Sequence, residues 1–167
     1  LALERIYTLA AELKSLDGKK KSLDHWLLSR INQNLRKINQ ELKDYNLREL
    51  ASIVYFTIYD DLRWYLRRGG ENKKTIQEAL KIWLVLINPI TPHLSEELNL
   101  AKEPIKELIS ASSWPEVKEE LISLKANAGE ELIKETMEGI RNVLKLAKIE
   151  KAKQFTLFIS QRWLYQL

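Results

Sequence analysis

The stretch LDHWLLSRINQNLRKIN, residues 23–39, decides the fold because its apolar residues recur at helical spacing. Those residues follow one another in steps of four and three: Leu27, Ile31, Leu35 and Ile38. Ser22 or Asp24 can accept a backbone N–H at the start and so cap a helix there. The opposite side carries polar and basic residues: Arg30, Asn34, Arg36 and Lys37. These two faces predict an amphipathic helix whose apolar side packs on other helices.

The same period continues in three further segments, residues 3–16, 47–65 and 73–87. The polar breaks DGKKKS, DYN and RRGGEN separate them, and Pro89 and Pro92 in NPITPH end the last one and start a short helix. Consecutive amphipathic helices with short connections predict an all-α fold, an antiparallel helix bundle. We expect its inward-facing residues to include Leu35, Ile58 and Leu80 on three neighbouring helices.

The chain changes character after SASSWPEV. Residues 130–148 predict a charged helix, whereas the β-branched and aromatic run QFTLFIS, residues 154–160, predicts a strand. A lone strand is not stable without a partner strand. We therefore expect residues 1–115 to form the bundle and residues 116–167 to form a linker helix and the start of a truncated unit, a short C-terminal α/β extension. Shorter helical segments are predicted at residues 103–109 and at the final QRWLYQL.

Composition bounds the function. The net charge is +4, with 45% hydrophobic and 30% charged residues, which is typical of a globular domain and permits a nucleic-acid partner. The absence of cysteine excludes a disulfide scaffold, a thiolate metal site and a cysteine nucleophile. No apolar run reaches the roughly 18 residues that a membrane span needs. The chain begins at Leu1 rather than Met, which favours a fragment of a longer protein.

Acidic and histidine residues form no catalytic or metal-binding pattern. Asp60 and Asp61 are adjacent, so on a helix they point about 100° apart and cannot share one substrate atom. We expect one of them to pair locally and the other to be solvated. His25 and His93 have no second ligand at metal-binding spacing. Because no glycine-rich phosphate loop or nucleophile elbow occurs either, the sequence predicts no catalytic and no metal site in this chain.

Basic residues gather in two places. The first is a stripe with spacings of four and three on the helix of residues 23–39: Arg30, Asn34 and Lys37. The second lies at the end of the following helix: Arg63, Arg67 and Arg68. Spacing alone favours solvated faces, with cations well placed at a helix C-terminus. Trp26 is most simply a core residue or a residue at the core edge.

Four pieces of the chain, in this order and spacing over residues 23–117, resemble a known family: DHWLLSRIN, YDDLRWYL, IWLVLINPITPHLSEEL and SSWPEV. The family is the helical anticodon-binding domain of class I aminoacyl-tRNA synthetases, in the leucyl, isoleucyl and valyl branch. The tail IRNVLKLAKIEKAKQFTLFISQRWLYQL is similar to the segment after the bundle in leucyl-tRNA synthetases of the archaeal and eukaryotic cytosolic type. One position departs from the pattern, because Asn99 stands after SEEL where the family usually carries Trp.

The resemblance implies a tRNA-binding fragment of a cytoplasmic leucyl-tRNA synthetase, which as a whole ligates leucine to tRNA(Leu) with ATP and Mg. Motifs like HIGH and KMSKS, which mark the catalytic domain, do not occur here, so we expect no cofactor and no catalysis in this chain. The implied partners are tRNA and the remaining domains of the synthetase, with no membrane. RNA helices of this kind are bound through phosphate and 2′-OH groups. The implied tRNA-binding residues are Trp26, Arg30, Asn34, Lys37, Arg63, Arg67 and Arg68.

Two alternatives stay open. The first is the same domain of an isoleucyl- or valyl-tRNA synthetase, since the bundle pieces are shared by all three enzymes. The second is a helical scaffold that binds another protein, which would need an exposed apolar patch of several hundred Å².

Overall fold

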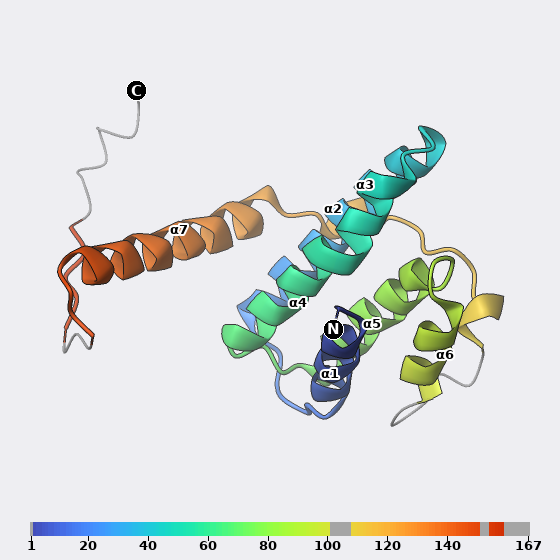
Figure 1. Cartoon of the computed structure of the whole chain (residues 1–167), viewed down its shortest axis with the longest axis horizontal. Coiled ribbons are helices and arrows are strands. Elements are labelled where there is room, and N and C mark those ends of the chain that lie inside the picture. The colour runs from blue at the N-terminus through green and yellow to red at the C-terminus, as the bar shows by residue number, and fades with distance from the viewer. Residues whose placement is uncertain (1, 101–107, 151–153, 159–167) are drawn as a thin grey trace. The chain divides into compact units, whose positions relative to one another are not determined.

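The computed structural model describes residues 2–100, 108–150 and 154–158, and its first hundred residues form a bundle of helices (Figure 1). The helices of the bundle are α1 (Ala2–Lys14), α2 (Ser22–Lys43), α3 (Leu47–Ser52), α4 (Ile58–Arg67), α5 (Lys73–Ile87) and α6 (Pro92–Leu100). These bounds lie close to those that the hydrophobic period predicts, and α5 matches its predicted range at both ends. The all-α helix bundle is therefore confirmed.

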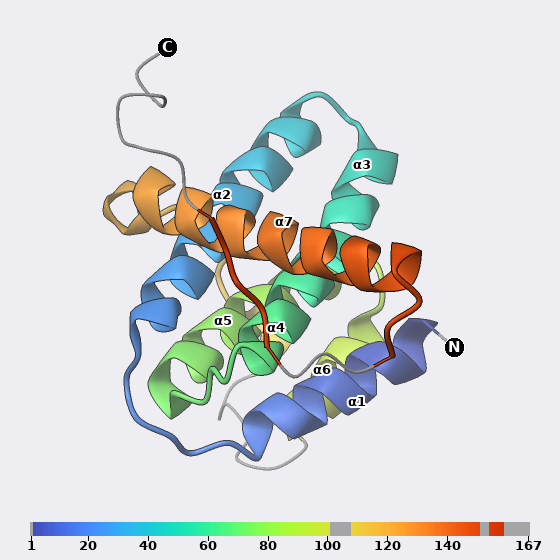
Figure 2. The same ribbon diagram turned by 90° about the vertical axis from the view of Figure 1, so that its left-hand side faces the viewer.

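The central helix of the bundle is α2, which contacts α3, α4 and α5 (Figure 2). Its apolar stripe is completely buried: Leu27, Ile31, Leu35 and Ile38. Ile58 of α4 and Leu80 of α5 are buried as well. The three core residues predicted on neighbouring helices, Leu35, Ile58 and Leu80, are thus confirmed as inward-facing.

A π-helical segment, Ile53–Thr57, joins α3 to α4, so that Leu47 to Arg67 is one continuous helix. In this segment the N–H of Ile58 donates to the carbonyl of Ile53, five residues back. The Trp83 indole of α5 donates to the neighbouring Val54 carbonyl at 2.8 Å. A side chain that bonds to the backbone in this way accompanies a local change of helical period. The sequence predicts the helix but not the π segment, because the tryptophan comes from a different helix.

A buried carboxylate at the start of α2 ties the helix to the end of α4. Asp24 is 2% exposed, and the Tyr65 hydroxyl donates to it at 2.5 Å. The Asn72 side-chain amide and the Lys21 backbone N–H each donate to its second oxygen at 2.8 Å. Burial raises the pKa of the Tyr65 hydroxyl, and its hydrogen bond to Asp24 raises it further. Gly70 is required beside this ring, because a Cβ there would lie 2.4 Å from Tyr65.

Residues 112–123, here called the strap, follow the outer side of α2. Four α2 side chains spaced three or four residues apart bind it, so they lie on one face of the helix. Near the C-terminal end of α2, the Trp114 indole donates to the Asn39 side chain at 2.8 Å, and Arg36 forms an ion pair with Glu119 at 3.2 Å. Nearer its N-terminal end, the Asn32 side chain accepts the Lys118 backbone N–H and the Ser29 hydroxyl accepts the Ser123 backbone N–H, both at 2.8 Å. The chain divides into two compact units, residues 1–129 and 130–167, so the strap belongs with the bundle. The boundary predicted at residues 115 and 116 falls inside the strap, and as a domain boundary it stays a prediction.

The charged helix predicted at residues 130–148 is α7 (Leu124–Leu146), which begins earlier than expected and has no buried residue. Residues 154–158 form neither helix nor strand. The strand predicted at residues 154–160 is therefore absent from the part of that segment that the structure describes, in keeping with the need of a strand for a partner. Outside the described residues lie residues 159–160 of that strand, the helical turn predicted in QRWLYQL and most of the helix predicted at residues 103–109.

Replacing Leu35 by Ala should lower the free energy of unfolding by about 2–5 kcal/mol, because its side chain is fully buried and leaves a cavity. The matched control is Leu47→Ala, since that leucine is 65% exposed, and it should cost no more than about 0.5 kcal/mol. Denaturant unfolding followed by circular dichroism measures both. Equal effects of the two substitutions would contradict the central place of α2.

Candidate nucleic-acid interface

The basic stripe predicted on α2 turns toward α4. The Arg30 Nε lies 3.1 and 3.2 Å from the two carboxylate oxygens of Asp61, and the Asn34 amide donates to one of them at 2.9 Å. Asp61 is 3% exposed and Asn34 is 6% exposed. A buried carboxylate needs hydrogen-bonded partners, and two side chains one helical turn apart supply them. The expectation that this stripe is solvated is therefore wrong for Asn34, and Arg30 is occupied by an ion pair.

Lys37, at the far end of the same stripe, is exposed. Its ammonium lies 2.7 Å from the Glu49 carboxylate of α3, and this hydrogen bond raises the pKa of Lys37. Both side chains are roughly half exposed, so the pair contributes little to stability. Exchange of Glu49 for an RNA phosphate would cost little, and Lys37 remains available as a phosphate-binding residue.

Trp26 is 2% exposed, which confirms it as a core residue. A nucleobase stacks on an aromatic ring only where a face of the ring is accessible. The buried indole offers no such face in this structure. Trp26 therefore contributes to the packing of α2 in the core.

The second predicted set, Arg63, Arg67 and Arg68 of α4 and its end, is exposed. The Arg63 guanidinium lies 5.7 Å from the centre of the Tyr59 ring, and that of Arg67 lies 5.5 Å from the centre of the Trp64 ring. Such contacts hold a guanidinium in place without neutralising its charge. The guanidinium groups of Arg63 and Arg67 are therefore accessible at the surface.

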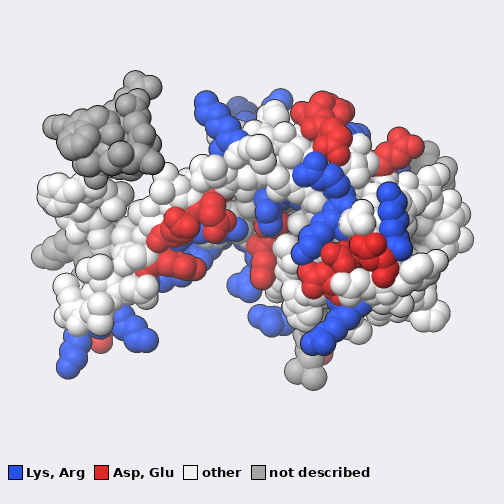
Figure 3. Space-filling model, turned by 90° about the horizontal axis from the view of Figure 1, so that it is seen from above, with Lys and Arg blue, Asp and Glu red and all other residues white. Residues whose placement is uncertain are grey.

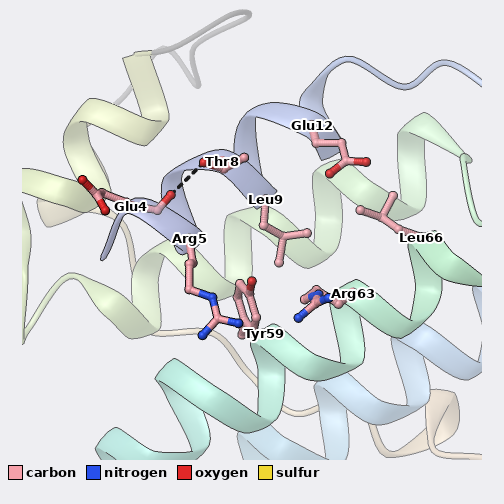
Figure 4. A pocket seen from close by; sticks show the side chains of 8 residues that line it. All are labelled: Glu4, Arg5, Thr8, Leu9, Glu12, Tyr59, Arg63 and Leu66. Atoms are coloured by element: carbon pink, nitrogen blue, oxygen red, sulfur yellow. Dashed lines mark hydrogen bonds between the residues drawn. The ribbon is translucent and has the colours of Figure 1, made fainter. Parts of the chain in front are cut away.

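An open cleft of about 470 Å³ lies between α1 and α4, and sequence analysis does not predict it (Figure 4). Its lining residues are Glu4, Arg5, Thr8, Leu9, Glu12, Tyr59, Arg63 and Leu66. The Arg5 guanidinium lies 5.9 Å from the centre of the Tyr59 ring, so that ring has an arginine from each helix beside it. Arg5 and Tyr59 are far apart in the chain, and no local pattern relates them; only the packing of α1 on α4 does.

The remaining candidates behave as single residues. Asp60 is exposed, as expected for one of the two, whereas Asp61 is buried and pairs with Arg30 of α2, 31 residues away, rather than locally. His25 and His93 are both exposed, and within the described ranges no three His, Cys, Asp or Glu residues gather as metal ligands. The same ranges contain no helix long and apolar enough to cross a membrane. On the face seen in Figure 3, basic and acidic side chains lie side by side, so the cations there do not form one continuous basic field.

A family model described as the anticodon-binding domain of tRNA ligase matches residues 24–158 of this chain. The chain belongs to this family. Its similar relatives include proteins named leucine–tRNA ligase from Methanococcus maripaludis strain C7 and Methanocaldococcus jannaschii, both 36% identical, and from Pyrococcus furiosus, 31% identical. Each match covers 99% of this chain, which spans only 17–18% of the length of these relatives. The resemblance inferred from the quoted pieces and the tail is confirmed.

In this anticodon-binding domain, the pieces that carry the resemblance supply contacts within the fold. DHWLLSRIN contributes Asp24 and Arg30, and YDDLRWYL contributes Asp61 and Tyr65 as their partners on α4. Asn99, at the position that departs from the family pattern, is buried, and its backbone carbonyl accepts from the Lys14 ammonium at 3.2 Å. This position thus lies where α1 meets the end of α6.

Replacing Arg30 by Ala should lower the free energy of unfolding by about 1–3 kcal/mol, because it leaves the buried Asp61 carboxylate with one donor fewer. Lys37→Ala is the matched control from the same stripe, and the exposure of its ion pair should keep its effect within about 0.5 kcal/mol. Thermal and denaturant melts of the two variants test this. An Arg30 variant as stable as the parent would contradict a structural role for the pair.

Proposed function

We propose that this anticodon-binding domain binds and positions tRNA(Leu) within a cytoplasmic leucine–tRNA ligase. The observation that carries the proposal is the family match over residues 24–158, together with relatives named leucine–tRNA ligase along 99% of the chain. The name of these relatives favours the leucyl enzyme over the isoleucyl and valyl alternatives. In such an enzyme, ATP and Mg would bind in a catalytic domain outside this chain, and the remaining domains would share the same tRNA.

The surface chemistry supports contact with the RNA backbone. Lys37 and the arginines Arg63, Arg67 and Arg68 are exposed cations, as phosphate binding requires. Arg30, Asn34 and Trp26 act instead through the fold, since the first two bind Asp61 and the third is buried. Because acidic side chains are interspersed among the cations, we expect weak binding by this chain alone. Because contacts to phosphates carry no sequence information, we expect this binding not to depend on the anticodon bases.

The first test measures binding of the 167-residue chain to leucine tRNAs that differ in their anticodons. We expect equal affinity for each tRNA and a fall in the binding constant with salt, with a log–log slope of about −2 to −4 for three or four phosphate contacts. Fluorescence titrations between 50 and 200 mM salt give both quantities, with a lysine-matched helical protein as the control. No binding at the lowest salt would overturn the proposed function, and a strong anticodon preference would overturn its backbone-directed form.

The second test concerns catalysis. Leucine-dependent exchange of pyrophosphate into ATP should be undetectable with this chain, because the sequence has neither catalytic motif of the synthetase. A whole leucine–tRNA ligase such as that of Methanocaldococcus jannaschii serves as the positive control. Exchange by the purified chain at a rate comparable to the control would contradict the assignment of this chain as a tRNA-binding part alone.

A further inference from the structure

The Tyr59 ring in the α1–α4 cleft is flanked by two guanidinium groups, 5.9 Å away for Arg5 and 5.7 Å away for Arg63. Throughout the part of the chain that the structure describes, neither arginine has a carboxylate within ion-pair distance. Arg30, Arg36 and Lys37 differ in this respect, since each forms an ion pair with an acidic side chain. The cleft is therefore a place where two cations converge and keep their charge.

A neutral ring beside two guanidinium groups fixes their positions without supplying a counterion. Two cations that line the same cleft raise its local potential and attract an anion more strongly than either would alone. Guanidinium groups also match the geometry of phosphate oxygens, to which they donate in pairs. A phosphate group is thus the ligand that this arrangement fits.

Figure 4 shows how the rest of the cleft restricts that ligand. The Arg5, Tyr59 and Arg63 side chains lie next to one another, and the Tyr59 hydroxyl is directed toward Leu9 on the α1 side. No hydrogen bond to this hydroxyl comes from the described residues. The carboxylates of Glu4 and Glu12 lie toward opposite ends of the cleft, so its centre is positive and its ends are negative. This pattern suits a short stretch of sugar–phosphate backbone rather than a long run of phosphates.

We propose that the α1–α4 cleft binds the sugar–phosphate backbone of tRNA, with Arg5 and Arg63 on phosphates to either side of the Tyr59 ring and the Tyr59 hydroxyl on the ribose 2′-OH between them. The proposal deepens the proposed function and rests on it, because tRNA is taken as the ligand. It extends the RNA-binding surface to α1, which lies outside all the pieces of sequence that carry the family resemblance. The 2′-OH is the group that distinguishes RNA from DNA at such a site, so the cleft is expected to bind RNA in preference to DNA.

The test compares the 167-residue parent with the double variant Arg5→Gln/Arg63→Gln in titrations with a tRNA(Leu) transcript. Both arginines are exposed, and a melt of the variant checks that the fold is kept. We expect binding at low salt to weaken about tenfold or more and the salt slope to flatten by about one to two units, as for two lost phosphate contacts. Glu12→Gln, in the same cleft, is the matched control and should leave binding unchanged or tighten it.

Two outcomes overturn the proposal and are distinguishable. If the parent binds tRNA and the double variant binds equally well, the cleft is not a contact site, while the proposed function stands. If the parent itself does not bind, both fail. Should the double variant melt early, Arg5→Gln alone replaces it, because this residue lies on the exposed side of α1, and it should give a smaller loss of the same kind.

Tyr59→Phe tests the hydroxyl by itself, because it keeps the ring beside both arginines. We expect the salt slope to stay unchanged and the preference for the tRNA transcript over DNA of the same sequence to fall by about threefold or more, as one lost 2′-OH contact would produce. An unchanged RNA-to-DNA ratio would show that the hydroxyl does not contact ribose and would overturn that part of the proposal. A loss equal for RNA and DNA would do the same.

Discussion

Three hydrogen-bonded pairs set α2 antiparallel to the continuous helix of α3 and α4. Asp24 binds Tyr65, Arg30 binds Asp61, and Lys37 binds Glu49, so the partner number falls as the α2 number rises. The first two pairs are buried or nearly so, and each contains a carboxylate that would be costly to bury without its donors. A shift of α2 by one turn would separate both carboxylates from these donors. The register of the bundle therefore depends on these pairs as much as on the apolar stripe beside them.

The same helix also binds the strap on another side, through Ser29, Asn32, Arg36 and Asn39. Three faces of α2 are thus in contact with the rest of the fold. One packs in the apolar core, one pairs with α3 and α4, and one binds the strap. Most polar side chains of residues 23–39 thus have partners inside the protein. Apart from Lys37, little of α2 remains for RNA, and the exposed arginines proposed to bind it lie on α1, on α4 and at the end of α4.

Much of the fold follows from sequence because helical periodicity is a local property. The apolar steps predict α1, α2, α5 and the continuous helix of α3 and α4, and Pro92 predicts the start of α6. Pro89 and the paired Gly69 and Gly70 mark the ends of α5 and α4. The π segment, the strap and the cleft do not follow, because each depends on residues brought together from distant parts of the chain. The sequence shows that Arg30 and Asn34 lie off the apolar stripe of their helix. It does not show whether they face solvent or a buried carboxylate of another helix, because both surroundings favour polar residues.

The same uncertainty about partners applies when RNA-binding residues are inferred from the residues that carry a family resemblance. A polar residue that recurs at a fixed spacing can be held there by a partner in the fold, as Asp24 and Arg30 are, or by a ligand. An arginine beside a carboxylate has its charge largely satisfied within the protein, and a phosphate must displace that carboxylate before it can bind. An arginine beside a tyrosine ring has no such competitor, since the ring holds the guanidinium and leaves its charge for an incoming anion. Arg5 and Arg63 meet this condition, and Arg5 lies outside every piece that carries the family resemblance. In this domain, the pattern thus marks residues that build the bundle, and the packing of α1 on α4 places Arg5, which the pattern does not contain, beside Tyr59 and Arg63, which it does contain.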